Sequence, residues 1–174
     1  MAEELILMRH AKSDWPEGVA DFNRPLKKRG RKAAQAMGEW LLAHKLIPDW
    51  IVASPAERAR DTAEKLCKGL GVKKRAVIHY DDRIYEANVS NLKSVLADCP
   101  TFARRVLLVG HNPGLDELLG YLVAGVTPAE DGKLFATATI ARLSLPNDWR
   151  QLNSQCGQLL ELRRASSLLG SFHD

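Results

Sequence analysis

The chain has 174 residues, of which 45% are hydrophobic, so it can bury a full core as one domain spanning residues 1–174. Its 25 basic and 21 acidic residues give a net charge of +4 on a mixed surface, which is not the pattern of a nucleic-acid-binding protein. No segment reaches the ~20 apolar residues of a membrane span, no secretory leader is visible, and three scattered cysteines do not make a disulfide framework. The composition therefore favours a soluble cytoplasmic protein with no membrane or nucleic-acid partner.

Short apolar runs alternate with segments of helical periodicity along most of the chain. This βαβα order is typical of a parallel sheet covered by helices. Expected strands lie at 4–8, 49–54, 76–80 and 104–110. Expected helices lie at 30–46, 55–71, 90–99 and 113–125.

Individual residues mark the ends of these helices. Pro55 suits a first helical turn, Gly71 a C-terminal cap, and Ser90 an N-cap. Two later segments, 136–145 and 157–164, read as edge strands added after the helical crossovers. The fold class that follows is α/β: a three-layer α/β/α sandwich with a mostly parallel sheet and edge strands added near the C-terminus.

Strong hydrogen-bond donors stand at three junctions between a strand and its helix. The first strand runs into Arg9 and His10, the second is followed by Arg58 one helical turn on, and the fourth by His111. In a parallel α/β sheet these junctions share one edge, where ligands bind. Two guanidinium forks, helix N-termini and a nucleophilic imidazole together indicate a phosphoryl ligand.

The motifs LMRHAKSDWP, DFNRPLKKRG, ASPAERARDTA and VGHNPGLDEL resemble those of the histidine phosphatase superfamily, which has a phosphoglycerate mutase-like fold, and in particular its small SixA-type phosphohistidine phosphatases. The resemblance runs from about Leu5 to Leu122. It implies that His10 is the nucleophile that becomes phosphorylated and that Arg9 and Arg58 clamp the phosphate. It also implies that His111 lies beside the transferring group and that His111 and Asn112 bind the substrate.

The proton donor is less well determined by the sequence. Glu86 follows the third strand at the same sheet edge, and Asp14 and Asp21 are the alternatives. A solvated carboxylate at a helix start is an equally good interpretation of Glu86. For His44, His79 and His173 a structural role is expected, and the basic segment 24–32 is expected to be a solvated loop and helix start that can steer anions.

The expected mechanism needs neither a metal nor a cofactor, since no zinc-type His/Cys spacing and no nucleotide-binding glycine motif is present. One nitrogen of His10 should donate to a carbonyl, the nearby arginines should lower its pKa, and His111 should act better as a cation once phosphate is bound.

The substrate expected from the resemblance is phosphohistidine on a signalling or transport phosphoprotein, because the chain is too short for the insertions that enclose small substrates in other branches. A phosphatase or mutase for small phosphoesters is the alternative. An inactive phosphate-binding module is a third hypothesis.

Overall fold

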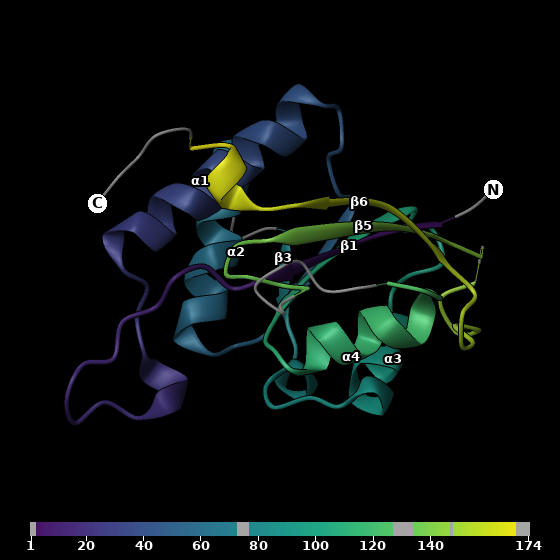
Figure 1. Ribbon diagram of the computed structural model, residues 1–174, viewed down its shortest axis with the longest axis horizontal. Helices are drawn as coiled ribbons and strands as arrows, with labels where there is room; N and C mark the ends of the chain where they lie inside the picture. Colours follow the sequence, from purple (N-terminus) through teal and green to yellow (C-terminus); the bar gives the residue numbers. More distant parts are fainter. Residues whose placement is uncertain (1–2, 73–76, 127–133, 147, 170–174) are drawn as a thin grey trace.

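The computed structural model describes residues 3–72, 77–126, 134–146 and 148–169, and its elements surround one six-stranded sheet (Figure 1). The strands are β1 (Glu3–Arg9), β2 (Trp50–Ala53), β3 (Ile78–Tyr80), β4 (Arg105–Gly110), β5 (Ile140–Leu145) and β6 (Gln158–Arg163). The helices are α1 (Lys28–Ala43), α2 (Glu57–Leu70), α3 (Val89–Ala97) and α4 (Gly114–Leu122). The described residues also contain the short 3-10 turns η1 (Asp21–Asn23), η3 (Asp82–Ile84) and η4 (Ala165–Ser167).

The sheet order is β3-β2-β4-β1-β5-β6, in which the first four strands are parallel and the last two antiparallel. The α/β class and the mostly parallel sheet are therefore confirmed. β5 differs from the expected edge strand, because it pairs with β1 on one side and β6 on the other, so only β6 lies at that edge. The unpaired side of the apolar β1 needs a partner, and β5 supplies it.

Side chains of β1 alternate between two cores on opposite faces of the sheet. Ile6 and Met8 pack in the core that α1 and α2 cover, whereas Leu5 and Leu7 pack in the core of α3 and α4. The two helix pairs lie on opposite sides of the strands in Figure 1, which makes three layers. Full burial on both faces explains why β1 reads as a continuous apolar run.

Close backbone approach fixes the pair of helices on the first face. A Cβ at Gly38 of α1 would lie 2.0 Å from the carbonyl oxygen of Leu66 in α2, and one at Gly69 would lie 2.2 Å from that of Gln35. Only glycine permits this contact between the helices. None of the helices within the described residues is long and apolar enough to cross a membrane.

Helix boundaries match the sequence in part. Gly71 ends α2 at φ 79°, as expected, but Pro55 lies before the Ala56 N-cap instead of in the first turn. The N-cap of α3 is Asn88, so the Ser90 assignment was wrong. Asn88 and Asn91 each accept a hydrogen bond from the other's backbone N–H, at 2.8 and 3.1 Å, and this reciprocal cap begins the helix earlier. Residue 76 of the third expected strand lies outside the described residues.

Candidate active site

Sheet register brings the three strand-to-helix junctions to one level. Arg9 pairs with Gly110 across β1 and β4, and Ala53 pairs with Val109 across β2 and β4. One residue further on, the backbone N–H of His10 donates to Gly110 and that of Ser54 donates to Val109, both at 3.0 Å. The polar residues after β1, β2 and β4 therefore meet at the carboxyl edge of the sheet, as expected.

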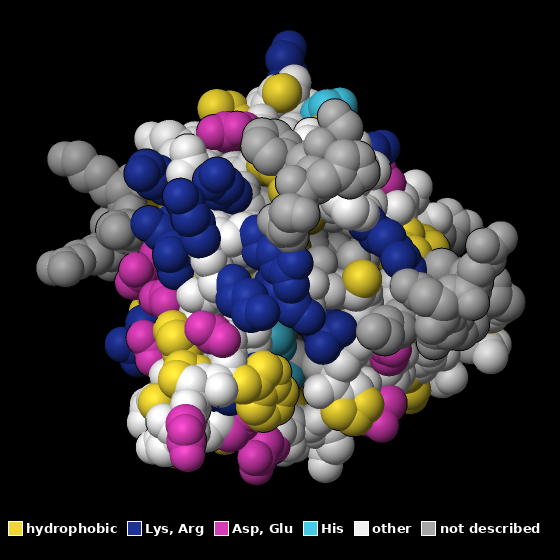
Figure 2. Space-filling view, turned by 60° about the vertical axis from the view of Figure 1, so that its left-hand side comes forward, with side chains coloured by type: hydrophobic (Ala, Val, Ile, Leu, Met, Phe, Trp, Pro, Cys, Tyr) yellow, Lys and Arg dark blue, Asp and Glu magenta, His cyan; other side chains and the backbone are white. Residues whose placement is uncertain are grey.

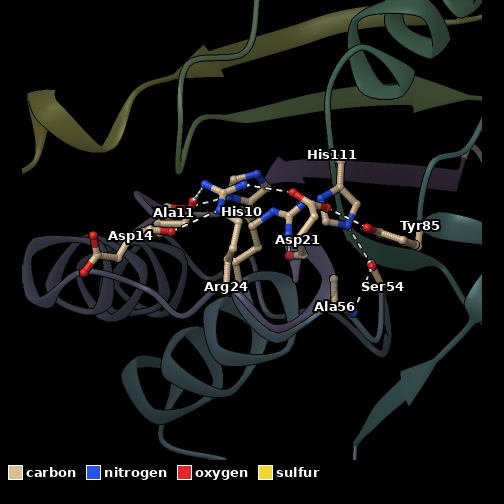
Figure 3. Close-up of polar contacts among 11 residues, drawn as sticks. His10, Ala11, Asp14, Asp21, Arg24, Ser54, Ala56, Tyr85 and His111 are labelled. Atoms are coloured by element: carbon tan, nitrogen blue, oxygen red, sulfur yellow. Dashed lines mark hydrogen bonds and ion pairs between the residues drawn. The ribbon is translucent and has the colours of Figure 1, made fainter. Parts of the chain in front are cut away.

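The two histidines lie against each other, with ring centroids 5.3 Å apart (Figure 3). His10 is 7% exposed, and its Nδ1 lies 2.8 Å from the carbonyl oxygen of Ala11. A carbonyl can only accept, so we assign the proton of the neutral ring to Nδ1. This leaves Nε2 of His10 unprotonated, which is the form that a nucleophile requires.

Ser54 holds the second ring. Its hydroxyl oxygen accepts from the backbone N–H of Ala56 at 3.2 Å and lies 2.7 Å from Nε2 of His111. With the N–H of Ala56 as donor to Ser54, the hydroxyl hydrogen can go to Nε2 of His111, which places the ring's own proton on Nδ1. That Nδ1 atom is buried and has no hydrogen-bond partner among the described residues.

Burial is the main reason why both rings stay neutral at pH 7. It lowers the pKa of His10 to about 3, with smaller contributions from His111, Arg9 and Arg58 against a raising backbone hydrogen bond. We predicted from the sequence that the arginines lower the pKa of His10, but desolvation has the larger effect. Burial followed by the charge of Arg58 lowers the pKa of His111 to about 4.

Arg9 and Arg58 both lie near His10, and each has an Nε atom that is available to a ligand. Arg9 donates from Nη1 to the carbonyl of Phe135 at 3.0 Å, and burial lowers its pKa. Arg58, 6% exposed, donates to the carbonyl and carboxylate of Asp21 at 2.7 and 3.1 Å. Within the described residues the buried Nε atoms of both have no partner. With Nδ1 of His111 they form a set of donors suited to an oxyanion.

Asp21 is held as an anion and does not suit the role of proton donor. It accepts from the hydroxyl of Tyr85 at 2.5 Å and from Arg58 and Arg24 at 3.1 and 3.2 Å. These contacts, with Tyr85 the largest, lower its pKa to about 2. A carboxyl that remains ionised has no proton to give, so its role is to position Arg58.

Asp14 points away from the pair of rings. Its carboxylate accepts from the backbone N–H of Trp15 at 2.9 Å, and Figure 3 places it on the far side of His10 from His111. Its carbonyl accepts from Arg24 at 3.0 Å. Arg24 is 6% exposed and also donates to Ser13 at 2.6 Å, so this end of the basic segment is buried, contrary to the expected solvated loop.

Glu86 is the carboxylate that lines the site. It is exposed, and together with Arg58, His111 and Asn112 it borders a cavity of about 380 Å³. The side chain of Asn112 is engaged at both ends, donating to Phe135 at 3.1 Å and accepting from the N–H of Asp116 at 3.2 Å. Its amide therefore fixes the loop after β4.

Sequence reasoning missed the hydroxyls that hold these groups. Thr62 is fully buried, accepts from the N–H of Ala11 at 2.9 Å and donates to the carbonyl of Arg58 at 2.6 Å. Its position four residues after Arg58, on the same face of α2, is a signal that could have found it. Ser54 directly follows β2 and offers a similar signal.

His44, His79 and the three cysteines lie away from the site. His44 stacks on Trp40 with ring centroids 4.2 Å apart, and His79 stacks on Trp50 at 3.8 Å, which fits structural roles. His173 lies outside the described residues. The three cysteines are not disulfide-bonded. Across the described ranges, no three His, Cys, Asp or Glu side chains gather in a way that could hold a metal ion.

Comparison with known proteins agrees with this geometry. Residues 5–98 match the model of the histidine phosphatase superfamily, branch 1, and the chain belongs to this family. An uncharacterized protein of Mycobacterium tuberculosis is 32% identical over 158 residues, covering 88% of this chain and 96% of the relative. Phosphohistidine phosphatase SixA of Escherichia coli is 28% identical over 144 residues, covering 82% and 85%.

A solved structure extends the likeness to the fold. A SixA protein from Nakamurella multipartitia, named as a phosphohistidine phosphatase by inference, superposes with a TM-score of 0.79 at 30% identity, covering 94% of this chain and 96% of its own. The mixed sheet with antiparallel C-terminal strands is thus the phosphoglycerate mutase-like fold.

The depressed pKa values make stability depend on pH. In the unfolded chain the imidazoles take up protons near pH 6.5. In the folded chain the pKa is about 3 for His10 and about 4 for His111. Between pH 7 and 5 the unfolded chain binds protons that the folded chain does not, so we expect the free energy of unfolding to fall by about 1–2 kcal/mol per ring. Urea unfolding at both pH values measures this.

Two variants calibrate that experiment. His10→Gln and His111→Gln each remove one buried neutral ring, and each should lose less stability than the wild type between pH 7 and 5. Equal stability of the wild type at both pH values would contradict the burial of neutral rings.

Proposed function

We propose that this protein hydrolyses phosphohistidine on a protein substrate through a covalent intermediate at His10. The observation that carries the proposal is the pairing of an unprotonated Nε2 of His10 with donors of Arg9, Arg58 and His111 that have no partner within the described residues, next to a cavity that Arg58 and His111 border. A nucleophile and a preformed oxyanion site in contact are what phosphoryl transfer requires.

In the first step, Nε2 of His10 attacks phosphorus as the bond from phosphorus to the substrate imidazole breaks. The leaving imidazole departs as a neutral ring when it has been protonated beforehand. The Nε atoms of Arg9 and Arg58 and Nδ1–H of His111 hydrogen-bond the equatorial oxygens, whose negative charge they offset. A bound phosphoryl group also favours the protonated form of His111, which adds a further positive charge.

In the second step, water attacks the phosphorus of phospho-His10 and inorganic phosphate leaves. The hydrogen bond from Nδ1 to the carbonyl of Ala11 keeps the ring in one tautomer through both steps. Asp21, held by Tyr85, fixes the guanidinium of Arg58 so that Nε stays directed at the phosphate. None of these steps uses a metal or a cofactor.

The choice of phosphohistidine rests mainly on likeness. The relative from Escherichia coli is named a phosphohistidine phosphatase, and Arg58 and His111 border a cavity of about 380 Å³ that could receive a phosphorylated side chain of another protein. The test compares a histidine-phosphorylated phosphotransfer domain with glucose 6-phosphate. We expect a much larger kcat/KM for the phosphorylated domain than for glucose 6-phosphate. Equal or better efficiency on the sugar phosphate would overturn the substrate assignment.

A small phosphoester is the second candidate, because Glu86 lines the cavity as a possible proton donor. An alkoxide leaving group needs such a donor, whereas a protonated imidazole does not. If Glu86 has this role, we expect Glu86→Gln to slow alkyl phosphoester cleavage by roughly 10²-fold or more, with a much smaller effect on phosphohistidine. Steady-state kinetics on both substrates measures the two effects.

The matched control is Glu117→Gln, which removes an exposed carboxylate from the first turn of α4, outside the residues that border the cavity. Unchanged rates for Glu86→Gln on both substrates would assign Glu86 to the solvated surface.

A further inference from the structure

A second cavity, of about 350 Å³, lies beside the histidines and is strongly basic. Its lining includes the side chains of Lys12, Arg29 and Arg164 with the hydroxyl residues Thr137 and Ser166. No acidic residue lines it within the described part of the chain. Lys and Arg side chains gather over this face in Figure 2, and histidine atoms are visible in the hollow between them.

The backbone ties this cavity to the proposed nucleophile. Lys12 follows His10 by two residues, and the N–H of Ala138, which also lines the cavity, donates to the carbonyls of Arg9 and His10 at 3.1 and 3.2 Å. The backbone carbonyl of Lys12 accepts from the N–H of Lys27 at 2.9 Å, which joins this segment to the start of α1. The cavity is therefore close enough to His10 for one protein substrate to occupy both places.

Charges at the start of α1 are opposite to those that a helix prefers there. The first turn has no acidic residue and instead holds Lys28 and Arg29, both exposed, after the Lys27 N-cap. Cations near the positive end of a helix dipole are unfavourable, and the exposed Lys28 lies there. Local rules are commonly broken where function requires it.

We infer that Lys12, Lys28, Arg29 and Arg164, called here the basic rim, bind carboxylates that flank the phosphorylated histidine of an acidic protein substrate. The rim spans the segment after β1, the first turn of α1 and the residue before η4, which packs on α1. Such a spread suits several carboxylates on a protein surface better than one phosphate. The inference rests on the proposed function, whose substrate it makes more specific.

The test uses two synthetic phosphohistidine peptides that differ only in whether glutamate or glutamine flanks the phosphorylated residue. For the wild type at low salt, we expect a kcat/KM roughly 10-fold or more higher for the glutamate peptide, in line with electrostatic steering. The variant K12Q/R29Q/R164Q should bring that ratio close to one. Its turnover of phosphoramidate, which has no flanking carboxylates, should stay unchanged.

Lys45→Gln is the matched control, because Lys45 is exposed just beyond the other end of α1, roughly 24 Å from its first turn. It should keep the wild-type preference. If the triple variant loses phosphoramidate turnover or unfolds, K28Q/R29Q, confined to the exposed first turn of α1, replaces it with the same expected loss of preference.

The outcomes separate the two proposals. The proposed role of the basic rim would be wrong if the wild type cleaved both peptides equally, or if the rim variants kept the preference for glutamate. Neither result would contradict the proposed function. Cleavage of neither peptide would overturn the proposed function and the rim with it. If the variants instead lost efficiency only on fructose 1,6-bisphosphate, the rim would be a site for a second phosphate.

Discussion

Replacing His10 with alanine is expected to lower phosphohistidine turnover by roughly 10³-fold or more while leaving the fold intact. The reason is chemical, because the other unprotonated ring nitrogen at the site, Nε2 of His111, is already engaged by the hydroxyl of Ser54. Among the described residues, the side chain of His10 hydrogen-bonds to the carbonyl of the adjacent Ala11, so its removal leaves no distant partner without a hydrogen bond. Phosphate released from a histidine-phosphorylated domain at fixed times measures turnover, and circular dichroism checks the fold.

His44→Ala serves as the control, since it removes an imidazole that stacks on Trp40 at the exposed end of α1. It should turn over substrate at the wild-type rate. A folded His10→Ala protein with wild-type-like turnover would end the nucleophile assignment.

Replacing Arg58 with alanine is the second large effect. We expect a loss of about 2–4 kcal/mol of transition-state stabilisation, or roughly 30- to 10³-fold in kcat/KM, the scale for removing one preorganised donor. In this variant Asp21 still accepts from Arg24, but it no longer has the guanidinium of Arg58 to position. Arg58→Lys should recover only part of the activity, because lysine has no Nε fork.

Arg60→Ala on the same helix is the matched control. Arg60 is exposed, donates to the carbonyl of Pro55 at 3.4 Å and lies over the ring of Tyr80 at 5.2 Å, away from the phosphate donors. Equal losses in Arg58→Ala and Arg60→Ala, or none in either, would show that Arg58 does not bind the transferring group.

Site residues that directly follow a strand could be predicted from the sequence. Arg9, His10, Arg58 and His111 could be brought together in advance because the carboxyl ends of parallel strands meet at one edge, whatever the lengths of the intervening segments. The same rule placed Glu86 at the cavity. The α/β class followed from the alternation of apolar runs and helical periodicity.

Contacts between loops could not be predicted in this way. Asp21 and Tyr85 are 64 positions apart, and their hydrogen bond depends on how two irregular segments fold over Arg58. Arg24 looked like one of several solvated cations, yet it is buried by partners from the loop after β1. No periodicity encodes such contacts, so the choice among Glu86, Asp14 and Asp21 needed the structure.

The most direct measurement of the central claim follows a radiolabelled phosphohistidine domain during a single turnover. Samples are quenched in base, which preserves phosphohistidine, and both free phosphate and labelled peptides are counted over time. We expect label to appear on the peptide that contains His10 before free phosphate accumulates, and His10→Ala to show neither. Phosphate release with no label on His10 at any time, or label on another residue, would contradict the covalent mechanism.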